Sequence, residues 1–480
     1  MRQFDTDRDI PEAIRAALTA RNTARDAQVE ATVRTILDDV RARGDQAVLD
    51  HTRRLDWPEA TAAALEVSAA DIVAAGEATA GEADLLLTAA GNIREFHEAE
   101  WSRQQSWDHD APGRLPGQSP LVSLAQLVQP VGRVGVYVPG GRAAYPSTVL
   151  MAGIPASVAG VDEVIVCTPP GPDGGILPLL LAACEVAGID RVFRIGGAQA
   201  VAAMAYGTET VPPCDVIVGP GSAYVNAAKR LVYGDVGIDM LAGPSEVAIV
   251  ADERANPAFV AADLLAQTEH GPDNKGVLFC HDSAMLELCK SELFEQRAAL
   301  ARQEILAVTA NNIVFVKTRS LEESLDLSNV LAPEHLELMV REPLAALPLV
   351  RNAGAVLLGD HTSAAVGDYW AGPSHTLPTA GAARFSSPLS AATFLKRTSV
   401  IYYSQAAASE AAEDVARFAE AEGFDGHARA ARLRGGEEPH PRPLPPKGEG
   451  AGAGAAILSP PGGEGGGEAS STFSVKEVGS

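Results

Sequence analysis

The chain has 480 residues and a mass of 49.8 kDa, and 46% of its residues are hydrophobic but only 5% aromatic. This length exceeds what one hydrophobic core usually organises, so we expect two or more domains. With 38 Lys and Arg against 62 Asp and Glu, the formal net charge is −24, which would repel a phosphate backbone and argues against nucleic-acid binding.

The cysteines and the apolar stretches indicate a cytoplasmic protein that crosses no membrane. The five cysteines form no C-x-x-C pair, which suits a reducing compartment and leaves any metal to other ligands; they are Cys167, Cys184, Cys214, Cys280 and Cys289. The N-terminus has no basic leader followed by an apolar core. The most apolar stretch, residues 176–189, is too short to span a bilayer and contains Pro178 and Glu185.

The first third of the chain has helical spacing, and the rest alternates strands with helices. Residues 27–55 and 62–101 show apolar positions at helical intervals. Beyond Val128, β-branched runs end at Gly or Pro and precede Ala-rich helical stretches. Four such runs are expected to be strands, at 133–141, 162–171, 191–197 and 214–221, and a second set of expected strands follows at 245–252, 275–282, 311–318 and 353–360. The alternation predicts two parallel α/β layers, with ligands where the strands end in glycine-rich turns.

The composition changes after Arg434. Residues 435–480 are rich in Gly and Pro with almost no large apolar side chains, so we expect a disordered tail. The glycine turns at 140–141, 196–197 and 219–221 follow predicted strands but do not complete a G-x-G-x-x-G dinucleotide fingerprint. Tight turns that need a positive φ explain each of them equally well.

Four segments carry side chains that suit catalysis or metal binding. Gln267 and His270 are three residues apart near the end of a predicted helix, so they share one face and could chelate a metal, although such a pair more often faces solvent. Pro333 predicts a helix start with Glu334 and His335 in its first turn. There the helix dipole would lower the pKa of the imidazole and leave a neutral base, or the pair would simply cap the helix.

The other two segments are a long loop and the end of the expected body. The predicted loop at 364–381 places Asp368 and His375 among Gly, Pro, Tyr and Trp, a costly composition for a mere connection, and makes Asp368 a candidate ligand. Glu422 and His427 come just before the tail, in what could equally be an ordinary helix flank. Spacing alone does not join the four segments into one site.

From about Arg2 to Arg434, the chain resembles the histidinol dehydrogenases, zinc- and NAD-dependent enzymes that complete histidine biosynthesis. Motifs along most of that length carry the resemblance, in the order found in the family: GVYVPGGRAAYPSTVLM, GGAQAVAAMAYG, IDMLAGPSEVAIVAD, AQTEHGPD, APEHLEL, GDYWAGPSHTLPT and EGFDGH. Two positions depart from the usual pattern, because Ser222 replaces an Asn and Leu241 replaces a Pro.

The resemblance implies roles for individual residues. Glu334 and His335 would be the catalytic pair, and Tyr137, Gln199 and Ser222 would contact NAD. One Zn²⁺ per subunit would be held by Gln267, His270, Asp368 and His427. The substrate would be bound by these four ligands together with Ser245, His335 and Glu422.

The resemblance also implies an aldehyde-dehydrogenase-like α/β architecture, with two incomplete Rossmann-like domains, one inserted in the other. The first domain, with the metal and catalytic residues, would comprise 27–130 and 247–389, and the inserted NAD-side domain 131–246. Terminal segments would be 1–26 and 390–434. The latter would be exchanged in a homodimer, so that Glu422 and His427 complete the partner's active site.

The implied reaction is the NAD-dependent, four-electron oxidation of L-histidinol through L-histidinaldehyde to L-histidine. The alternatives are a family member that oxidises another polar alcohol, a zinc hydrolase that needs no nucleotide, and a non-catalytic metal-binding protein. The chain has no H-E-x-x-H motif, which argues against the hydrolase. A non-catalytic protein would need no Glu334 and His335 beside a full ligand set.

Overall fold

The computed structural model of the chain describes residues 2–19, 27–111, 122–140, 145–268, 271, 273–300 and 308–436. These residues belong to two compact units, one built from 1–104 and 130–395 and the other from 105–129 and 396–480. None of the helices in the described ranges is long and apolar enough to cross a membrane. The predicted tail lies outside the described residues except for Gly435 and Gly436.

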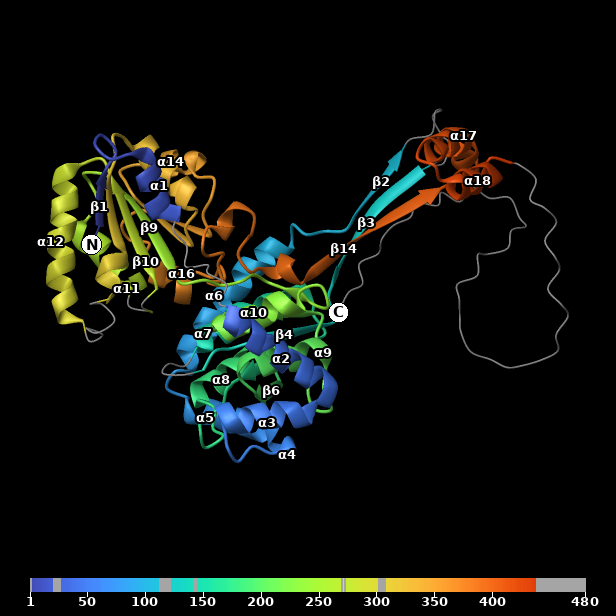
Figure 1. The fold of residues 1–480 in the computed structure, drawn as a ribbon, viewed down its shortest axis with the longest axis horizontal. Helices are drawn as coiled ribbons and strands as arrows, with labels where there is room; N and C mark the ends of the chain where they lie inside the picture. The colour runs from blue at the N-terminus through green and yellow to red at the C-terminus, as the bar shows by residue number, and fades with distance from the viewer. Residues whose placement is uncertain are drawn as a thin grey trace. The chain divides into compact units, whose positions relative to one another are not determined.

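The first unit contains a six-stranded parallel sheet (Figure 1). Its order is β1-β11-β10-β9-β12-β13, with strands β1 (Arg2–Asp5), β9 (Glu246–Ala251), β10 (Lys275–Cys280), β11 (Ile313–Lys317), β12 (His335–Met339) and β13 (Ala355–Leu358). Apolar residues of α11 (Pro257–Thr268) and α12 (Ser283–Ala299) cover one face. Those of α1 (Pro11–Thr19) and α14 (Leu321–Leu331) cover the other. Both faces are therefore buried, as parallel sheets require.

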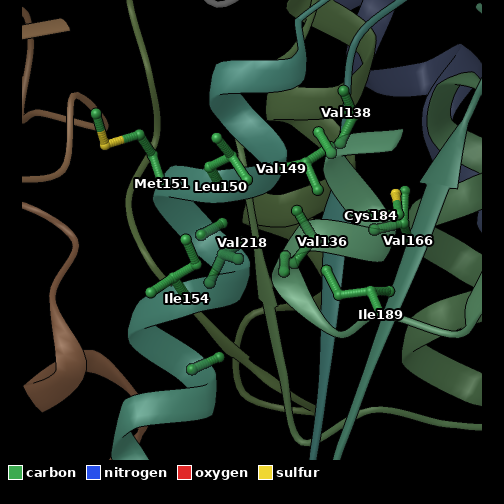
Figure 2. Packing of buried hydrophobic residues seen from close by; sticks show 14 of the residues in the cluster. Val136, Val138, Val149, Leu150, Met151, Ile154, Val166, Cys184, Ile189 and Val218 are labelled. Atoms are coloured by element: carbon green, nitrogen blue, oxygen red, sulfur yellow. The ribbon is translucent and has the colours of Figure 1, made fainter. Parts of the chain in front are cut away.

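The same unit contains a five-stranded parallel sheet, whose strands come between β1 and β9 in the sequence. Its order is β6-β5-β4-β7-β8, with β4 (Arg133–Tyr137), β5 (Glu163–Thr168), β6 (Arg191–Arg194), β7 (Val216–Val218) and β8 (Gly237–Ile238). One face packs against α5 (Ala69–Ala78), α6 (Ala83–Trp101), α7 (Pro146–Ala159) and α8 (Pro178–Ala187). Figure 2 shows part of this core, in which Ile154 of α7 lies beside Val218 of β7.

The opposite face of this sheet is covered by α2 (Ala27–Arg43), α3 (Asp45–Leu55), α9 (Gly197–Tyr206) and α10 (Ala223–Val232). Short helical segments complete the unit: α4 (Ala62–Leu65), α15 (Pro343–Ala346), α16 (Ala364–Tyr369), η1 (Ala310–Asn312), η2 (Leu347–Leu349), η3 (Ala382–Arg384) and η4 (Ala391–Phe394). The two parallel sheets and the inserted order confirm the predicted α/β class.

The expected grouping of segments differs from the structure in the N-terminal third. Residues 27–130 were expected with the six-stranded sheet, yet the helices between 27 and 101 pack on the five-stranded one. The reason is visible in α2, whose apolar stripe, including Val33 and Ile36, joins the same core as Phe193 of β6. Conversely, the first residues form β1 and extend the six-stranded sheet beside β11.

The second unit is built around three strands and a helical hairpin. Its sheet has the order β14-β3-β2, formed by β2 (Trp107–Ala111), β3 (Val122–Pro130) and β14 (Leu395–Tyr403), and β2 runs antiparallel to β3. Helices α17 (Gln405–Ala421) and α18 (Asp425–Arg434) pack against each other. Arg432 joins them through ion pairs with Glu413 and Glu420.

Candidate active site

A cavity of about 170 Å³ in the first unit is lined by polar side chains from distant parts of the chain. We call it the catalytic cavity. Its lining includes Ser245, Gln267, Glu334, His335, Asp368 and His375. Five predicted site residues therefore meet in one place, although spacing alone could not join them.

The catalytic cavity lies at the edge of the six-stranded sheet where β9 and β12 begin. Ser245 directly precedes β9, and His335 is the first residue of β12, where it is paired with Val247. In this sheet the cavity is therefore at the start of the strands, whereas we expected ligands where strands end. The five-stranded sheet contributes Pro220, in the turn after β7, to the same cavity.

Glu334 and His335 stand at the start of a strand, so the helix predicted from Pro333 is wrong. Helix α14 ends at Leu331, Ala332 adopts a φ of 51°, and the chain then enters β12 between β9 and β13. Proline is tolerated both at the first turn of a helix and at the first residue of a strand, so the sequence signal is shared. Pairing on both sides of β12 decides in favour of the strand.

Glu334 is buried and held by the backbone of the neighbouring strand. The amide nitrogen of Glu246 donates a hydrogen bond of 2.9 Å to Glu334 Oε2, and Gln267 Nε2 lies 3.5 Å from the same oxygen. Burial raises the pKa of Glu334 to about 7, although nearby His335 acts in the opposite direction. A carboxyl group with such a pKa can accept or donate a proton near neutral pH.

His335 is 3% exposed and lies between two carboxyl groups. Its Nε2 donates to Asp368 Oδ1 at 3.2 Å, and its Nδ1 lies 3.8 Å from Glu334 Oε2. Burial lowers the pKa of His335, but the hydrogen bond to Asp368 and the charge of Glu334 outweigh it, so the net shift is upward. The lowered pKa expected from a helix dipole is therefore wrong, because carboxyl groups rather than a helix terminus surround the ring.

Gln267 is held in the last turn of α11, as predicted, and is buried. Its backbone oxygen accepts a hydrogen bond of 3.0 Å from Asn274 Nδ2, and Asn274 Oδ1 accepts one from the amide of Ser245. Asn274 thus joins two predicted site residues, and the sequence analysis missed it because nothing in its local pattern marks that role. The predicted partner of Gln267, His270, lies outside the described residues.

Asp368 lies on a short helix, α16, and not in the loop that we expected. Helix α16 is hydrogen-bonded to β12 near both of its ends. The Ala364 amide donates to Glu337 Oε1 at 3.1 Å, and Asp368 accepts from His335. His375 Nδ1 in turn lies 3.1 Å from the backbone oxygen of Asp368. The Gly- and aromatic-rich sequence obscured this single helical turn.

The residues of the cavity suit a metal with nitrogen and oxygen ligands. Gln267 and Asp368 supply two side-chain oxygens to one cavity, and none of the five buried cysteines lines it. Within the described ranges, no cluster of three or more His, Cys, Asp or Glu side chains could hold a metal ion. Such a cluster would need the two predicted histidine ligands, of which His270 is not described and His427 belongs to the second unit.

The three predicted NAD contacts lie at the carboxyl edge of the five-stranded sheet. Tyr137 ends β4, Gln199 is in the first turn of α9, and Ser222 directly precedes α10. The Gly197 amide donates to the Tyr137 hydroxyl at 3.2 Å. Both amide atoms of Gln199 are buried without a hydrogen-bond partner among the described residues, so this side chain has capacity for a ligand.

Glu422 and His427 belong to the second unit. Glu422 ends α17, and His427 is in the first turn of α18, where its ring lies 5.4 Å from that of Phe424. Both residues are exposed.

Comparison with known proteins places the chain in one family. The sequence model of the histidinol dehydrogenase family matches residues 19–435 of this chain. The chain is 45% identical over 422 residues to histidinol dehydrogenase of Geobacter sulfurreducens, covering 87% of this chain and 96% of the relative. It is 48% identical to that of a Synechococcus species, covering 84% and 92%.

A solved structure agrees with the sequence relatives. The crystal structure of histidinol dehydrogenase from Elizabethkingia anophelis has a TM-score of 0.83 and 34% identity, covering 90% of this chain and 98% of the other. The family match, the relatives and the fold therefore agree with the resemblance carried by the motifs. The chain belongs to the histidinol dehydrogenase family, the oxidoreductases of histidine biosynthesis.

Proposed function

We propose that the catalytic cavity oxidises L-histidinol through L-histidinaldehyde to L-histidine, with Glu334 and His335 as the proton-transfer groups. The observation that carries this proposal is the buried contact between these two residues in a cavity also lined by Gln267 and Asp368. NAD accepts one hydride in each of the two oxidation steps. Water supplies the second oxygen of the product.

Zinc suits the donor set, with Gln267, His270, Asp368 and the partner subunit's His427 as its proposed ligands. Imidazole nitrogens and side-chain oxygens without thiolate are ligands of catalytic zinc sites that leave room for substrate. Bound there, zinc would hold the imidazole and amine of the substrate and so fix the position of the alcohol carbon. Ser245 lines the same cavity and would contact the substrate.

In the first step, His335 takes the hydroxyl proton as the carbon–hydrogen bond breaks and the hydride leaves to NAD. The ring is well placed for this role, because its contacts with Asp368 and Glu334 fix its orientation and stabilise the charged imidazolium. The product of this step is the aldehyde, one NADH and one proton on the enzyme. His335 must lose that proton before it can act again.

In the second step, Glu334 takes a proton from the water that adds to the aldehyde carbon. The resulting hydrate anion loses its second hydride to another NAD, and His335 takes the remaining hydroxyl proton, which leaves the carboxylate. A pKa of about 7 suits Glu334 to this exchange near neutral pH. His335 therefore acts as a base in both oxidation steps, whereas Glu334 acts only in the second.

We further propose a cytoplasmic homodimer with shared active sites, in which residues 390–434 contribute the partner subunit's Glu422 and the partner subunit's His427. Large apolar side chains on this segment support the dimer: Ile401 is 70% exposed and Phe418 is 71% exposed. Such exposure is typical of a surface that another chain covers. The five unpaired cysteines suit the reducing cytoplasm.

The test is to incubate the purified protein with L-histidinol and NAD, with and without a chelator. We expect two NADH per histidinol, and loss of this activity on chelation that zinc restores. Turnover of other polar alcohols but not histidinol would reject the substrate, and hydrolysis without NAD would favour the zinc hydrolase. For the shared site, mixed dimers of H270A and H427A subunits should recover activity, and failure to recover any would contradict it.

A further inference from the structure

A second cavity in the first unit lies beside the carboxyl ends of β4 and β5. It has a volume of about 630 Å³, and we call it the β4–β5 cavity. Turns rich in Pro and Gly form most of its wall, with Pro139, Gly140 and the segment 168–173 among the lining residues. This is the position at which open α/β sheets bind ligands.

The wall depends on glycine at two positions. A Cβ on Gly140 would lie 2.4 Å from Pro169 Cγ, and one on Gly196 would lie 2.5 Å from Pro169 Cβ. Real Cβ atoms do not come this close, so only glycine at these two positions lets the turns after β4 and β6 pack against the Pro169 ring in the turn after β5. The three turns therefore form one closely packed wall beside the cavity.

Asp56 is a carboxylate in this wall whose side chain has no partner among the described residues. It follows the last residue of α3, and no described residue pairs with its side chain by a hydrogen bond or an ion pair. Burial alone raises the pKa of Asp56. By contrast, Asp173, the other carboxylate of the lining, accepts a hydrogen bond of 3.0 Å from the Gly175 amide in its own turn.

The neighbours of Asp56 hold it in place over the wall. The amides of Asp56 and Trp57 both donate to the Thr52 carbonyl, at 2.9 and 2.8 Å. The Trp57 ring lies so close to Gly174 that a Cβ there would be 2.5 Å from ring atom Cε2. A half-buried carboxylate on a hydrogen-bonded turn, with no side-chain partner among the described residues, is a candidate to accept hydrogen bonds from a ligand.

Asp56 also lies next to the predicted NAD contacts. Its Oδ2 is 3.2 Å from the position that a Cβ on Gly196 would take. The next residue, Gly197, donates to the Tyr137 hydroxyl and would place a Cβ 2.8 Å from Gln199 Oε1. The β4–β5 cavity and the two NAD-contacting side chains therefore meet at the start of α9.

The strand order indicates which end of the cofactor reaches Asp56. β4 lies between β5 and β7, and the chain continues to opposite sides of it, which is the switch point of the sheet. The catalytic cavity includes Pro220, after β7, whereas Asp56 is on the β5 side. A dinucleotide laid across the end of β4 with its nicotinamide toward the catalytic cavity has its adenosine at the β4–β5 cavity.

We propose that Asp56 accepts hydrogen bonds from the adenosine ribose hydroxyls of NAD and excludes the 2′-phosphate of NADP. This inference rests on the proposed NAD-dependent function and names the residue that selects its cofactor. The described residues that line the β4–β5 cavity include no Lys, Arg or His that could bind a phosphate. A fixed carboxylate beside the 2′ position would repel that group.

The test compares D56N with a matched control, D173N, which alters the other carboxylate of the same wall. Binding of ADP-ribose and of 2′-phospho-ADP-ribose is measured by calorimetry, and kcat and KM are measured with NAD and NADP. Wild type should prefer the unphosphorylated ligand. D56N should reduce that preference by about tenfold or more, the size expected for a hydrogen bond to a charged group. The change should lie in KM, with kcat at saturating NAD unchanged.

D173N should keep the wild-type preference, and D56S provides a second substitution if D56N does not fold. An unchanged preference in the folded Asp56 variant would overturn the proposal, as would an equal change in D173N. A fall in kcat with KM unchanged would also overturn it. The proposed function would fail if the wild-type protein formed no NADH from L-histidinol. This outcome is distinguishable from a failure of the Asp56 proposal, because the binding measurements require no turnover.

Discussion

The β4–β5 cavity and the catalytic cavity each adjoin a parallel sheet, but they lie at opposite ends of the strands. The β4–β5 cavity lies where strands end, and its wall is rich in glycine and proline and includes Asp56, a carboxylate without a side-chain partner in the described part of the chain. The catalytic cavity lies where β9 and β12 begin, and its wall holds buried side chains that titrate, above all Glu334 and His335. Backbone approach suits the binding of an extended cofactor, whereas proton transfer needs burial that shifts pKa values.

The largest expected effect comes from His335. Replacing it with Gln removes the proposed base of both oxidation steps, so kcat should fall by about 10²- to 10⁴-fold in each. ADP-ribose affinity should be unchanged, because the β4–β5 cavity is intact. The control is H281Q, which alters a half-buried histidine just after β10, at the opposite edge of the same sheet. A loss of ADP-ribose binding in H335Q would contradict the separation of the two cavities.

A substitution at Gly219 tests the close backbone contact beside Tyr137, one of the predicted NAD contacts. Its φ is 110°, and a Cβ there would lie 2.1 Å from the carbonyl oxygen of Tyr137. G219A should therefore lower the free energy of unfolding by about 1–3 kcal/mol and weaken NAD binding. Gly234 is a matched control, because its φ is 111° and no atom lies within 4 Å of its Cβ position. Equal destabilisation by G219A and G234A would show that φ, rather than the contact, is responsible.

A carboxyl pair behind the catalytic cavity should produce a smaller, pH-dependent effect. Glu337 is fully buried in β12, its Oε1 accepts a hydrogen bond of 3.1 Å from the Ala364 amide of α16, and the carboxyl group of Asp263 in α11 acts on its charge. It thereby joins the elements that carry His335, Gln267 and Asp368. Burial first, and the charge of Asp263 second, raise the pKa of Glu337 well above its usual 4.5.

The folded protein therefore holds this proton more tightly than the unfolded chain. Its contribution to stability is fully present below the usual carboxyl pKa and is lost as pH rises through the raised one. E337Q keeps an uncharged hydrogen-bonding group, so relative to wild type it should gain about 1 kcal/mol or more between about pH 5 and about pH 8. Denaturant unfolding at both pH values measures this gain. The exposed variant E287Q serves as control, and the proposed proton on Glu337 is wrong if the E337Q gain is absent.

The smallest effect is expected at the C-terminus. The family match ends at residue 435, and the sequence beyond it has the composition of a disordered tail. Truncation after Gly436 should leave kcat, KM and the melting temperature unchanged. A clear loss in any of the three would assign a function to these residues.

Local sequence patterns predicted the strands that are apolar and are followed by Gly or Pro turns, such as β4 and β5. They failed at β12, because Pro333 and Glu334 resemble a helix start and only pairing with strands far away in the sequence decides the outcome. The same limit applies to the site. The i, i+3 spacing placed Gln267 on its helix, whereas the contacts of Asn274 and Asp263 join residues that no local pattern connects.

The central claim is that His335 takes a proton in both oxidation steps, whereas Glu334 acts only in the second. The most direct test measures each half-reaction separately in E334Q, supplying L-histidinol or L-histidinaldehyde with NAD. Our account predicts that the aldehyde step falls by about 10²-fold or more while the alcohol step changes far less. Equal losses in the two steps would contradict it.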